Sequence, residues 1–177
     1  MHAKLDELVL AMTGAVPLGP LVSASNFRKL ITGVTVEPST ERTEQMSVFE
    51  MLQQVNAASP FNAWAGFELM SAEDGKAELA VNARAELLQH SGFLHAAVIA
   101  GLIDTACGFA AATVAGNVLA SQYQVMCFAP AIGERFAARA KVSRAGKRQV
   151  FATAELFAQS GSQEKLVAGG SAVLMVA

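Results

Sequence analysis

The sequence predicts an α+β fold in which an antiparallel sheet wraps round one long central helix. Residues 95–114 consist almost entirely of Ala, Val, Ile, Leu and Gly, and this length of apolar chain favours a helix buried on nearly every side. Four strand-like runs then follow in succession, as in an antiparallel meander. With 177 residues, 53% of them hydrophobic and 16% charged, the chain is long enough for one domain with a sizeable core.

The first part of the chain differs in character from the rest. Pro17 and Pro20 break its apolar stretch, and residues 35–45 are rich in Thr, Glu and Ser. We interpret residues 1–45 as an N-terminal extension and residues 46–177 as the domain.

The domain is expected to begin with a helix. Apolar residues recur at helical spacing from Ser47, and the pattern ends before Pro60. Residues 61–69 are predicted to form a strand, residues 73–75 a turn, and residues 77–81, where apolar and polar residues alternate, a second strand.

After the central helix, four further strands are predicted. They cover residues 118–128, 134–142, 149–158 and 165–176.

Composition excludes several classes of protein. A net charge of −2 and a pI near 5.9 argue against a general nucleic-acid binder. No run reaches the roughly 18 uninterrupted apolar residues of a membrane span. Asp6 and Glu7 precede the apolar N-terminal stretch, where a signal peptide carries positive charge. We therefore expect a cytoplasmic protein with no membrane and no nucleic-acid partner.

The two cysteines give no sign of a metal site. Cys107 and Cys127 lie in apolar runs without CxxC or metal-type spacing, and we interpret both as reduced core residues.

One acidic residue lies within the apolar central helix. Asp104 is the single Asp or Glu between Glu86 and Glu134, and no Lys or Arg occurs between Arg84 and Arg135. Burying an unpaired carboxylate costs several kcal/mol, so such a residue is rare unless it is paired or used. Asp104 is therefore either a functional carboxylate or a structural one that bonds to a neighbouring loop or subunit.

The residues before Asp104 resemble a known signature. Residues 88–97 read Leu-Gln-His-Ser-Gly-Phe-Leu-His-Ala-Ala, which is similar to the PaaI-like and 4-hydroxybenzoyl-CoA thioesterases of the hot-dog fold. In that family a loop ending in His-Gly-Gly precedes a catalytic Asp or Glu by nine residues, the spacing from His95 to Asp104. Gln89 stands where relatives often carry Gln or Asn, and residues 128–133 resemble the Pro-Ala-x-x-Gly strand ending of the family.

The resemblance implies hydrolysis of an acyl-CoA thioester, with no cofactor because CoA is part of the substrate. Asp104 is then the general base or the nucleophile, and the Ala96 backbone N–H is the oxyanion donor. Gln89 orients the carbonyl or the water, and His95 fixes the loop or polarises the substrate. The chain departs from the family where Ala96 and Ala97 replace the two glycines, whose missing methyl groups allow a thioester to approach the backbone.

Helix geometry sets a further condition. Nine residues at about 100° each turn a helix by about 900°, so His95 and Asp104 point to opposite sides if both are helical. In the family the site lies at a dimer interface, with the carboxylate from one subunit and the loop from the other. A homodimer, paired into a dimer of dimers, is accordingly implied.

A basic segment follows the fourth predicted strand. Arg144, Lys147 and Arg148 are either a solvated hairpin or a cradle for the CoA phosphates, and the resemblance favours the cradle.

Three other functions compete with thioester hydrolysis. A hydratase or dehydratase of the same fold carries a His-Asp hydratase motif or a His-Phe-Pro run, and neither occurs here. A non-catalytic acyl-CoA-binding or regulatory hot-dog protein is favoured by Ala96, Ala97 and Gly108, since many relatives carry Ser or Thr at the position of Gly108. The third alternative is an unrelated structural domain.

Overall fold

The structure, a computed structural model, describes residues 46–177, and the predicted extension over residues 1–45 lies outside the described part. The helices are α3 (Val48–Ala58), α4 (Pro60–Ala65), the short 3-10 helix η1 (Ala85–Leu87) and α5 (Ala96–Ala115). The strands are β1 (Glu68–Glu73), β2 (Lys76–Asn82), β3 (Val118–Cys127), β4 (Arg135–Ala145), β5 (Gln149–Ser160) and β6 (Gln163–Val176).

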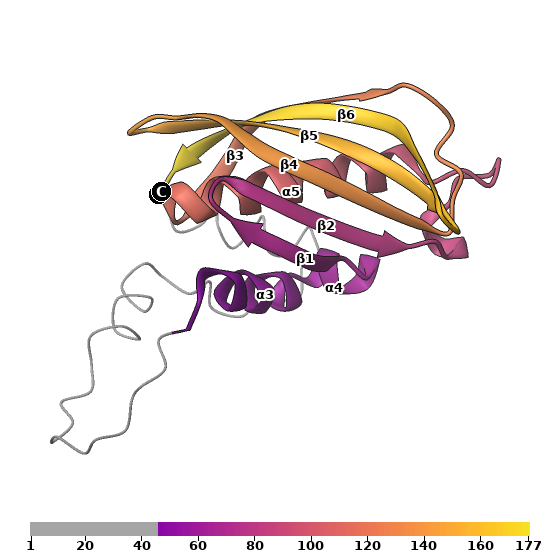
Figure 1. The fold of residues 1–177 in the computed structure, drawn as a ribbon, viewed down its shortest axis with the longest axis horizontal. Coiled ribbons are helices and arrows are strands. Elements are labelled where there is room, and N and C mark those ends of the chain that lie inside the picture. The colour runs from indigo at the N-terminus through magenta and orange to yellow at the C-terminus, as the bar shows by residue number, and fades with distance from the viewer. Residues whose placement is uncertain (1–45) are drawn as a thin grey trace, which may run out of the picture. The chain divides into compact units, whose positions relative to one another are not determined.

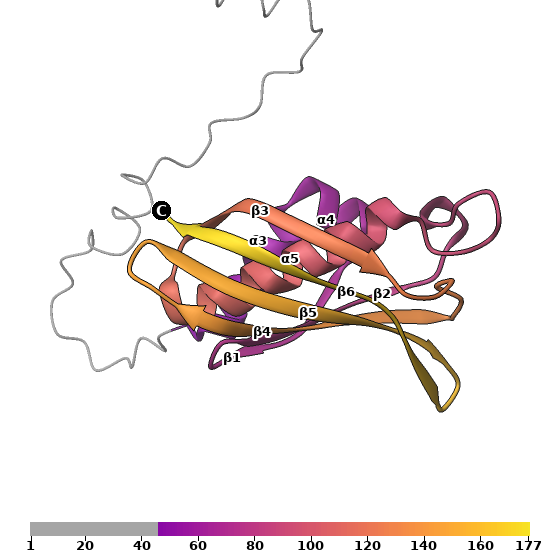
Figure 2. The same cartoon turned by 90° about the horizontal axis from the view of Figure 1, so that it is seen from above.

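All six strands form one antiparallel sheet in the order β1-β2-β4-β5-β6-β3. The sheet curves round α5, which runs along its concave side (Figures 1 and 2). The predicted plan of a sheet wrapped round one central helix is therefore confirmed.

The core lies between α5 and the concave side of the sheet. Leu102, Ile103 and Ala106 of α5 are fully buried, and they pack with inward-facing strand residues such as Leu79 and Leu156. By length and composition α5 also matches a membrane span, with a mean hydropathy of 1.8 over an 18-residue window. Half of that window is buried inside the protein, as in the core helix of a folded domain.

The helix predicted after Ser47 is confirmed as α3. The Ser47 hydroxyl accepts a hydrogen bond from the Glu50 N–H at 3.2 Å, and the Glu50 carboxylate accepts one from the Ser47 N–H at 2.7 Å. This reciprocal capping box satisfies two of the amide groups that begin the helix. Hydrogen bonds from the Ser47 backbone and side chain hold the pKa of Glu50 below its ordinary value.

The strand predicted over residues 61–69 is wrong for all but its last two residues. Pro60 begins the helix α4, because its fixed φ suits the first turn and the amide it lacks would be unpaired there. Gly66 ends this helix in the left-handed conformation, at a φ of 76°. The strand β1 therefore starts only at Glu68.

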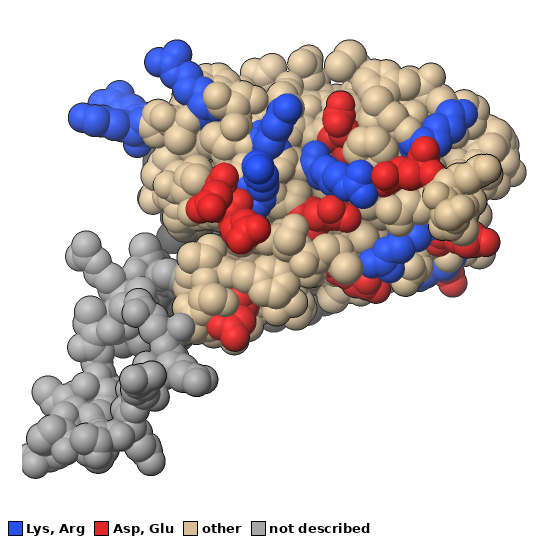
Figure 3. Space-filling view, viewed as in Figure 1, with Lys and Arg blue, Asp and Glu red and all other residues tan. Residues whose placement is uncertain are grey.

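The alternation predicted for residues 77–81 is confirmed on its buried side. In β2 the side chains of Ala77, Leu79 and Val81 are buried, and the four strands after α5 overlap the four predicted ranges. The outer side of the sheet carries interspersed acidic and basic side chains (Figure 3). Arg139 there pairs with Glu78 at 3.2 Å and with Glu164 at 2.8 Å. Exposed ion pairs of this kind add little stability, so this side is held mainly by the core beneath it.

Candidate active site

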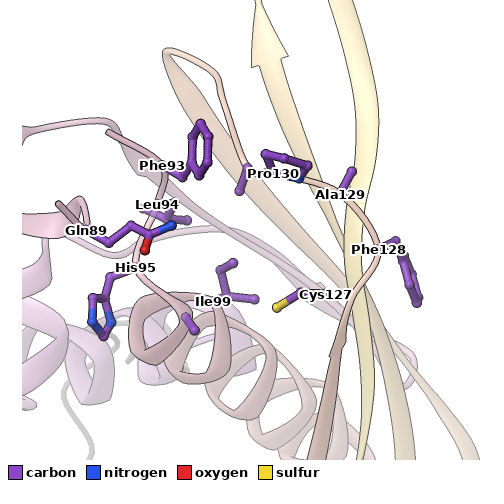
Figure 4. Close-up of a pocket in the computed structure, with 11 residues that line it drawn as sticks. Gln89, Phe93, Leu94, His95, Ile99, Cys127, Phe128, Ala129 and Pro130 are labelled. Carbon is purple, nitrogen blue, oxygen red and sulfur yellow. The ribbon is translucent and has the colours of Figure 1, made fainter. Parts of the chain in front are cut away.

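A pocket of about 460 Å³ opens at the N-terminal end of α5. It lies between the loop before the helix and the segment that follows β3 (Figure 4). Its walls are Gln89, Phe93, Leu94, His95, Ala96, Ile99 and residues 127–131. Three of the sequence-predicted site residues, Gln89, His95 and Ala96, are therefore brought together at one cavity.

The loop that carries Gln89 is closed by its own backbone. The Gln89 N–H donates to the Phe93 carbonyl at 2.8 Å, and the Leu94 N–H donates to the Ala131 carbonyl at 3.0 Å. The second bond ties the loop to the segment after β3, which forms the facing wall. The half-buried Gln89 side chain thus starts from a fixed backbone and extends into the pocket (Figure 4).

The first turn of α5 presents an unpaired amide to this pocket. His95 is the N-cap, with extended backbone angles, and its Nδ1 accepts a hydrogen bond from the Ala97 N–H at 3.1 Å. Within residues 46–177 the Ala96 N–H has no hydrogen-bond partner. The positive end of the helix dipole adds to the attraction of this amide for an anion, so the geometry suits a developing oxyanion.

Asp104 is a half-buried carboxylate without a partner. Its Oδ1 atom is shielded from solvent and forms no hydrogen bond in the described part of the chain. Burial raises the pKa of the Asp104 carboxyl. The buried Cys107 thiol lies three residues further along α5, and its pKa is raised to about 12, first by burial and then by the charge of Asp104. Cys107 is therefore a protonated core residue, as predicted.

Asp104 does not line the pocket. It lies eight residues beyond Ala96, which corresponds to about 12 Å along the helix axis. His95 is extended rather than helical, so the 900° turn estimated for nine helical residues does not apply between His95 and Asp104. One chain alone does not bring Asp104 to the Ala96 amide.

Strand β3 offers a place for a second chain. It forms one edge of the sheet, and only Val118 and Val125 among its side chains are even partly buried. Leu119, Tyr123 and Met126 are each more than half exposed. A ten-residue edge strand with exposed apolar side chains is a template for pairing with another strand.

The basic residues lie at the other end of the sheet. Arg144, Lys147 and Arg148 are exposed at the hairpin between β4 and β5, where Lys and Arg side chains project (Figures 1 and 3). The eleven residues of β4 run from near the pocket to this hairpin, a span of roughly 35 Å. Within one chain the hairpin is therefore far from Gln89, His95 and Ala96.

The prediction that Cys127 is a core residue is wrong. Cys127 is exposed and unoxidised, and it lines the pocket opposite Ile99 (Figure 4). It ends β3, which is an edge strand of the sheet. The apolar residues around Cys127 in the sequence do not indicate that their strand lies at an edge. The motif at residues 128–133 was the available signal that this wall belongs to the site. No cluster of His, Cys, Asp or Glu within residues 46–177 is arranged to hold a metal ion.

Comparison with known proteins identifies the family. The thioesterase superfamily model matches residues 91–165. A thioesterase family protein from Silicibacter pomeroyi is 32% identical over 73% of this chain and 97% of its own, with a TM-score of 0.70. The chain belongs to the thioesterase superfamily.

Two further structures share its hot-dog fold. A mutant of the phenylacetic acid degradation protein PaaI from Thermus thermophilus is 26% identical over 67% of this chain and 100% of its own, with a TM-score of 0.61. Zebra fish thioesterase superfamily member 2 is 24% identical over 75% of this chain and 100% of its own, with a TM-score of 0.64. No curated protein matches the chain. Membership in the superfamily supports thioester hydrolysis as its activity.

Proposed function

We propose that this thioesterase hydrolyses acyl-CoA and that Asp104 supplies the catalytic carboxylate. The observation that carries the proposal is the buried Oδ1 atom of Asp104, which has no hydrogen-bond partner in the described residues. A carboxylate held in this way is costly for folding, and its perturbed pKa is typical of a functional group.

The chemistry has two possible routes. As general base, Asp104 takes a proton from water while the resulting hydroxide attacks the thioester carbon. As nucleophile, it attacks that carbon itself, and water then hydrolyses the mixed anhydride. In both routes the Ala96 N–H stabilises the oxyanion, Gln89 orients the carbonyl or the water, and CoA leaves as the thiolate and is protonated.

The site is proposed to form between two copies of the chain. Antiparallel pairing of two β3 strands about a two-fold axis would continue the sheet and bury the exposed apolar residues of that edge. It would also set the pocket end of one chain towards the hairpin end of its partner, since β3 runs from the hairpin end to the pocket. Arg144, Lys147 and Arg148 would then bind the CoA phosphates, and two such dimers would pair into a tetramer.

The test is release of CoA thiol from a panel of acyl-CoAs, comparing the native chain with Asp104→Asn. Turnover is expected to fall about 100-fold or more, because a general acid–base group contributes that much. Glu155→Gln, which neutralises an exposed carboxylate on β5, is the control and should leave turnover unchanged. Turnover that is indifferent to Asp104→Asn would overturn the assignment. A single turnover in H₂¹⁸O that places label in the Asp104 peptide would identify the nucleophilic route.

The alternative is a non-catalytic acyl-CoA-binding protein. Its support is the pair of methyl groups on Ala96 and Ala97, both exposed where relatives have glycine. Tight binding of acyl-CoA by calorimetry without release of CoA thiol would favour this alternative.

A further inference from the structure

Three aromatic side chains gather where α4 and β1 meet the first half of α5. The Phe61 and Phe67 rings meet edge to face with 5.7 Å between centroids, and the Phe61 and Trp64 rings are 6.0 Å apart. Phe67 is 5% exposed and belongs to the core, but Phe61 is 46% exposed and Trp64 55%. Two of the three rings therefore keep apolar surface that residues 46–177 do not cover.

The Phe61 ring lies directly against the backbone of α5. A Cβ atom built on Gly101 would be only 2.9 Å from Phe61 Cε1, so glycine is what allows this approach. Gly101 precedes Asp104 by three residues, which places the two positions side by side on the helix surface. The exposed edge of the aromatic cluster thus borders the position of the unpaired carboxylate.

Polar contacts surround two of these aromatic residues, Phe67 and Trp64. The Asn56 side chain donates to the Phe67 carbonyl at 2.7 Å, and the Asn62 side chain donates to Asn56 Oδ1 at 3.0 Å. Both asparagines are 7% exposed. Arg84 places its guanidinium 5.2 Å from the centre of the Trp64 ring and donates to the Trp64 carbonyl. Such a network fixes apolar surface in advance of binding, which lowers the cost of ordering it around a ligand.

We propose that Phe61 and Trp64 form the wall that contacts the acyl group, and that they set which acyl groups the enzyme accepts. This inference rests on the proposed hydrolysis at Asp104 and names its substrate class. Gly101, against which the Phe61 ring packs, lies about 4.5 Å from Asp104 along the helix axis, so an acyl chain that extends along α5 from a carbonyl at Asp104 meets the ring. An acetyl group has a single methyl group and can bury little of this aromatic surface. Acyl chains of about six carbons, and aromatic acyl groups that pair with the rings, reach this wall and bury it.

The test compares kcat/KM for acetyl-CoA, hexanoyl-CoA and phenylacetyl-CoA. In Phe61→Ala the value is expected to fall about tenfold or more for the two larger substrates, while acetyl-CoA changes by less than about twofold. Phe151→Ala is the matched control. Phe151 is also a partly exposed phenylalanine, but it lies on the outer side of β5, between the buried residues Val150 and Ala152. It should leave the ratio between the substrates unchanged.

A second variant guards against loss of folding in the first. Gly101→Ala keeps all three rings and adds one methyl group, which must displace the edge of the Phe61 ring. The same change of selectivity is expected, with a native melting curve.

The possible outcomes distinguish failure of the proposed acyl wall from failure of the proposed acyl-CoA hydrolysis. If both variants lower hydrolysis of all three substrates equally, or leave every value unchanged, the acyl wall is refuted and the hydrolysis stands. If the native chain hydrolyses none of the three, nor any other acyl-CoA of the panel, the proposed function falls and the acyl wall falls with it.

Discussion

His95 Nδ1 accepts a hydrogen bond from the Ala97 N–H at 3.1 Å, and the N–H of the neighbouring Ala96, which lines the pocket, has no partner in the described residues. The histidine thus pairs with one of the first two backbone amides of α5, that of Ala97, and leaves the other unpaired. This arrangement supports a positioning role for His95 in the proposed mechanism, because the cap fixes the turn that carries the Ala96 amide.

Removal of the cap should therefore weaken both the fold and the proposed catalysis. His95→Ala is expected to lower the free energy of unfolding by about 0.5–2 kcal/mol, the usual cost of losing an N-cap, and to lower kcat. His95→Asn keeps an acceptor on a shorter side chain, so its stability should lie closer to that of the native chain. Urea denaturation measures the difference, and a His95→Ala variant as stable as the native chain would show that the imidazole cap does not stabilise α5.

Replacement of Asp104 should change how stability depends on pH. Burial raises the pKa of Asp104 in the folded chain above its ordinary value of 3.8, so between these two values the folded state binds more protons than the unfolded state. Stability contributed by the protonated form is then lost as pH rises through this window. Asp104→Asn carries no charge and should gain stability relative to the native chain as pH increases.

Thermal unfolding across the range from acid to neutral pH measures this difference. The curves of the two proteins should converge in acid and separate to a constant gap above the raised pKa. A gap that is largest in acid would mean that the carboxylate is stabilised by a partner. The proposed catalysis also depends on this ionisation. Asp104 must be ionised to act as base or nucleophile, so kcat should fall in acid as the carboxyl becomes protonated.

A charge in the middle of β3 should separate the subunits. If two β3 strands pair about a two-fold axis, Gln122→Lys places two ammonium groups close together near the centre of the new contact, which disfavours pairing. Gel filtration should shift to the monomer and hydrolysis should be lost, since Asp104 and the Ala96 amide would no longer meet. Ser143→Lys adds the same charge to an exposed position of β4 as a control. A Gln122→Lys monomer with full activity would contradict the shared site.

Replacing the basic residues of the hairpin with neutral ones should weaken binding of the nucleotide part of CoA only. The triple variant Arg144→Ala, Lys147→Ala and Arg148→Ala is expected to raise KM for acyl-CoA about tenfold and to leave kcat nearly unchanged, because it removes contacts remote from the reaction. For an acyl-pantetheine substrate, which lacks the nucleotide phosphates, KM should not change. A rise of KM for both substrates would show that the hairpin does not recognise phosphate.

The sequence was sufficient for the plan of the fold because its main signals are local. The capping box at Ser47 and the length of the apolar segment that became α5 each reflect the chemistry of neighbouring residues. The error at residues 61–69 arose where two signals competed. Phe61 and Trp64 are residue types enriched in strands, but Pro60 and Gly66 set the ends of a helix around them.

The candidate site likewise has parts that local sequence predicted and parts that it did not. Gln89, His95 and Ala96 lie in one contiguous motif, so their meeting at a pocket followed from the chain itself. Asp104 does not line that pocket, and in the proposed dimer its place relative to them depends on a surface between two chains. The exposure of Cys127 depends on β3 being an edge, which only the strand order reveals.

That strand order also bears on how the protein is made. β6 is the last strand in chain order, yet it lies between β5 and β3, and it is the only strand in the described sheet that pairs with β3. During synthesis β3 therefore leaves the ribosome without a neighbour and waits while β4 and β5 are built, for several seconds at roughly 5–20 residues per second. For that interval the nascent chain carries an unpaired apolar strand, which is the form of the protein that chaperones are most expected to bind.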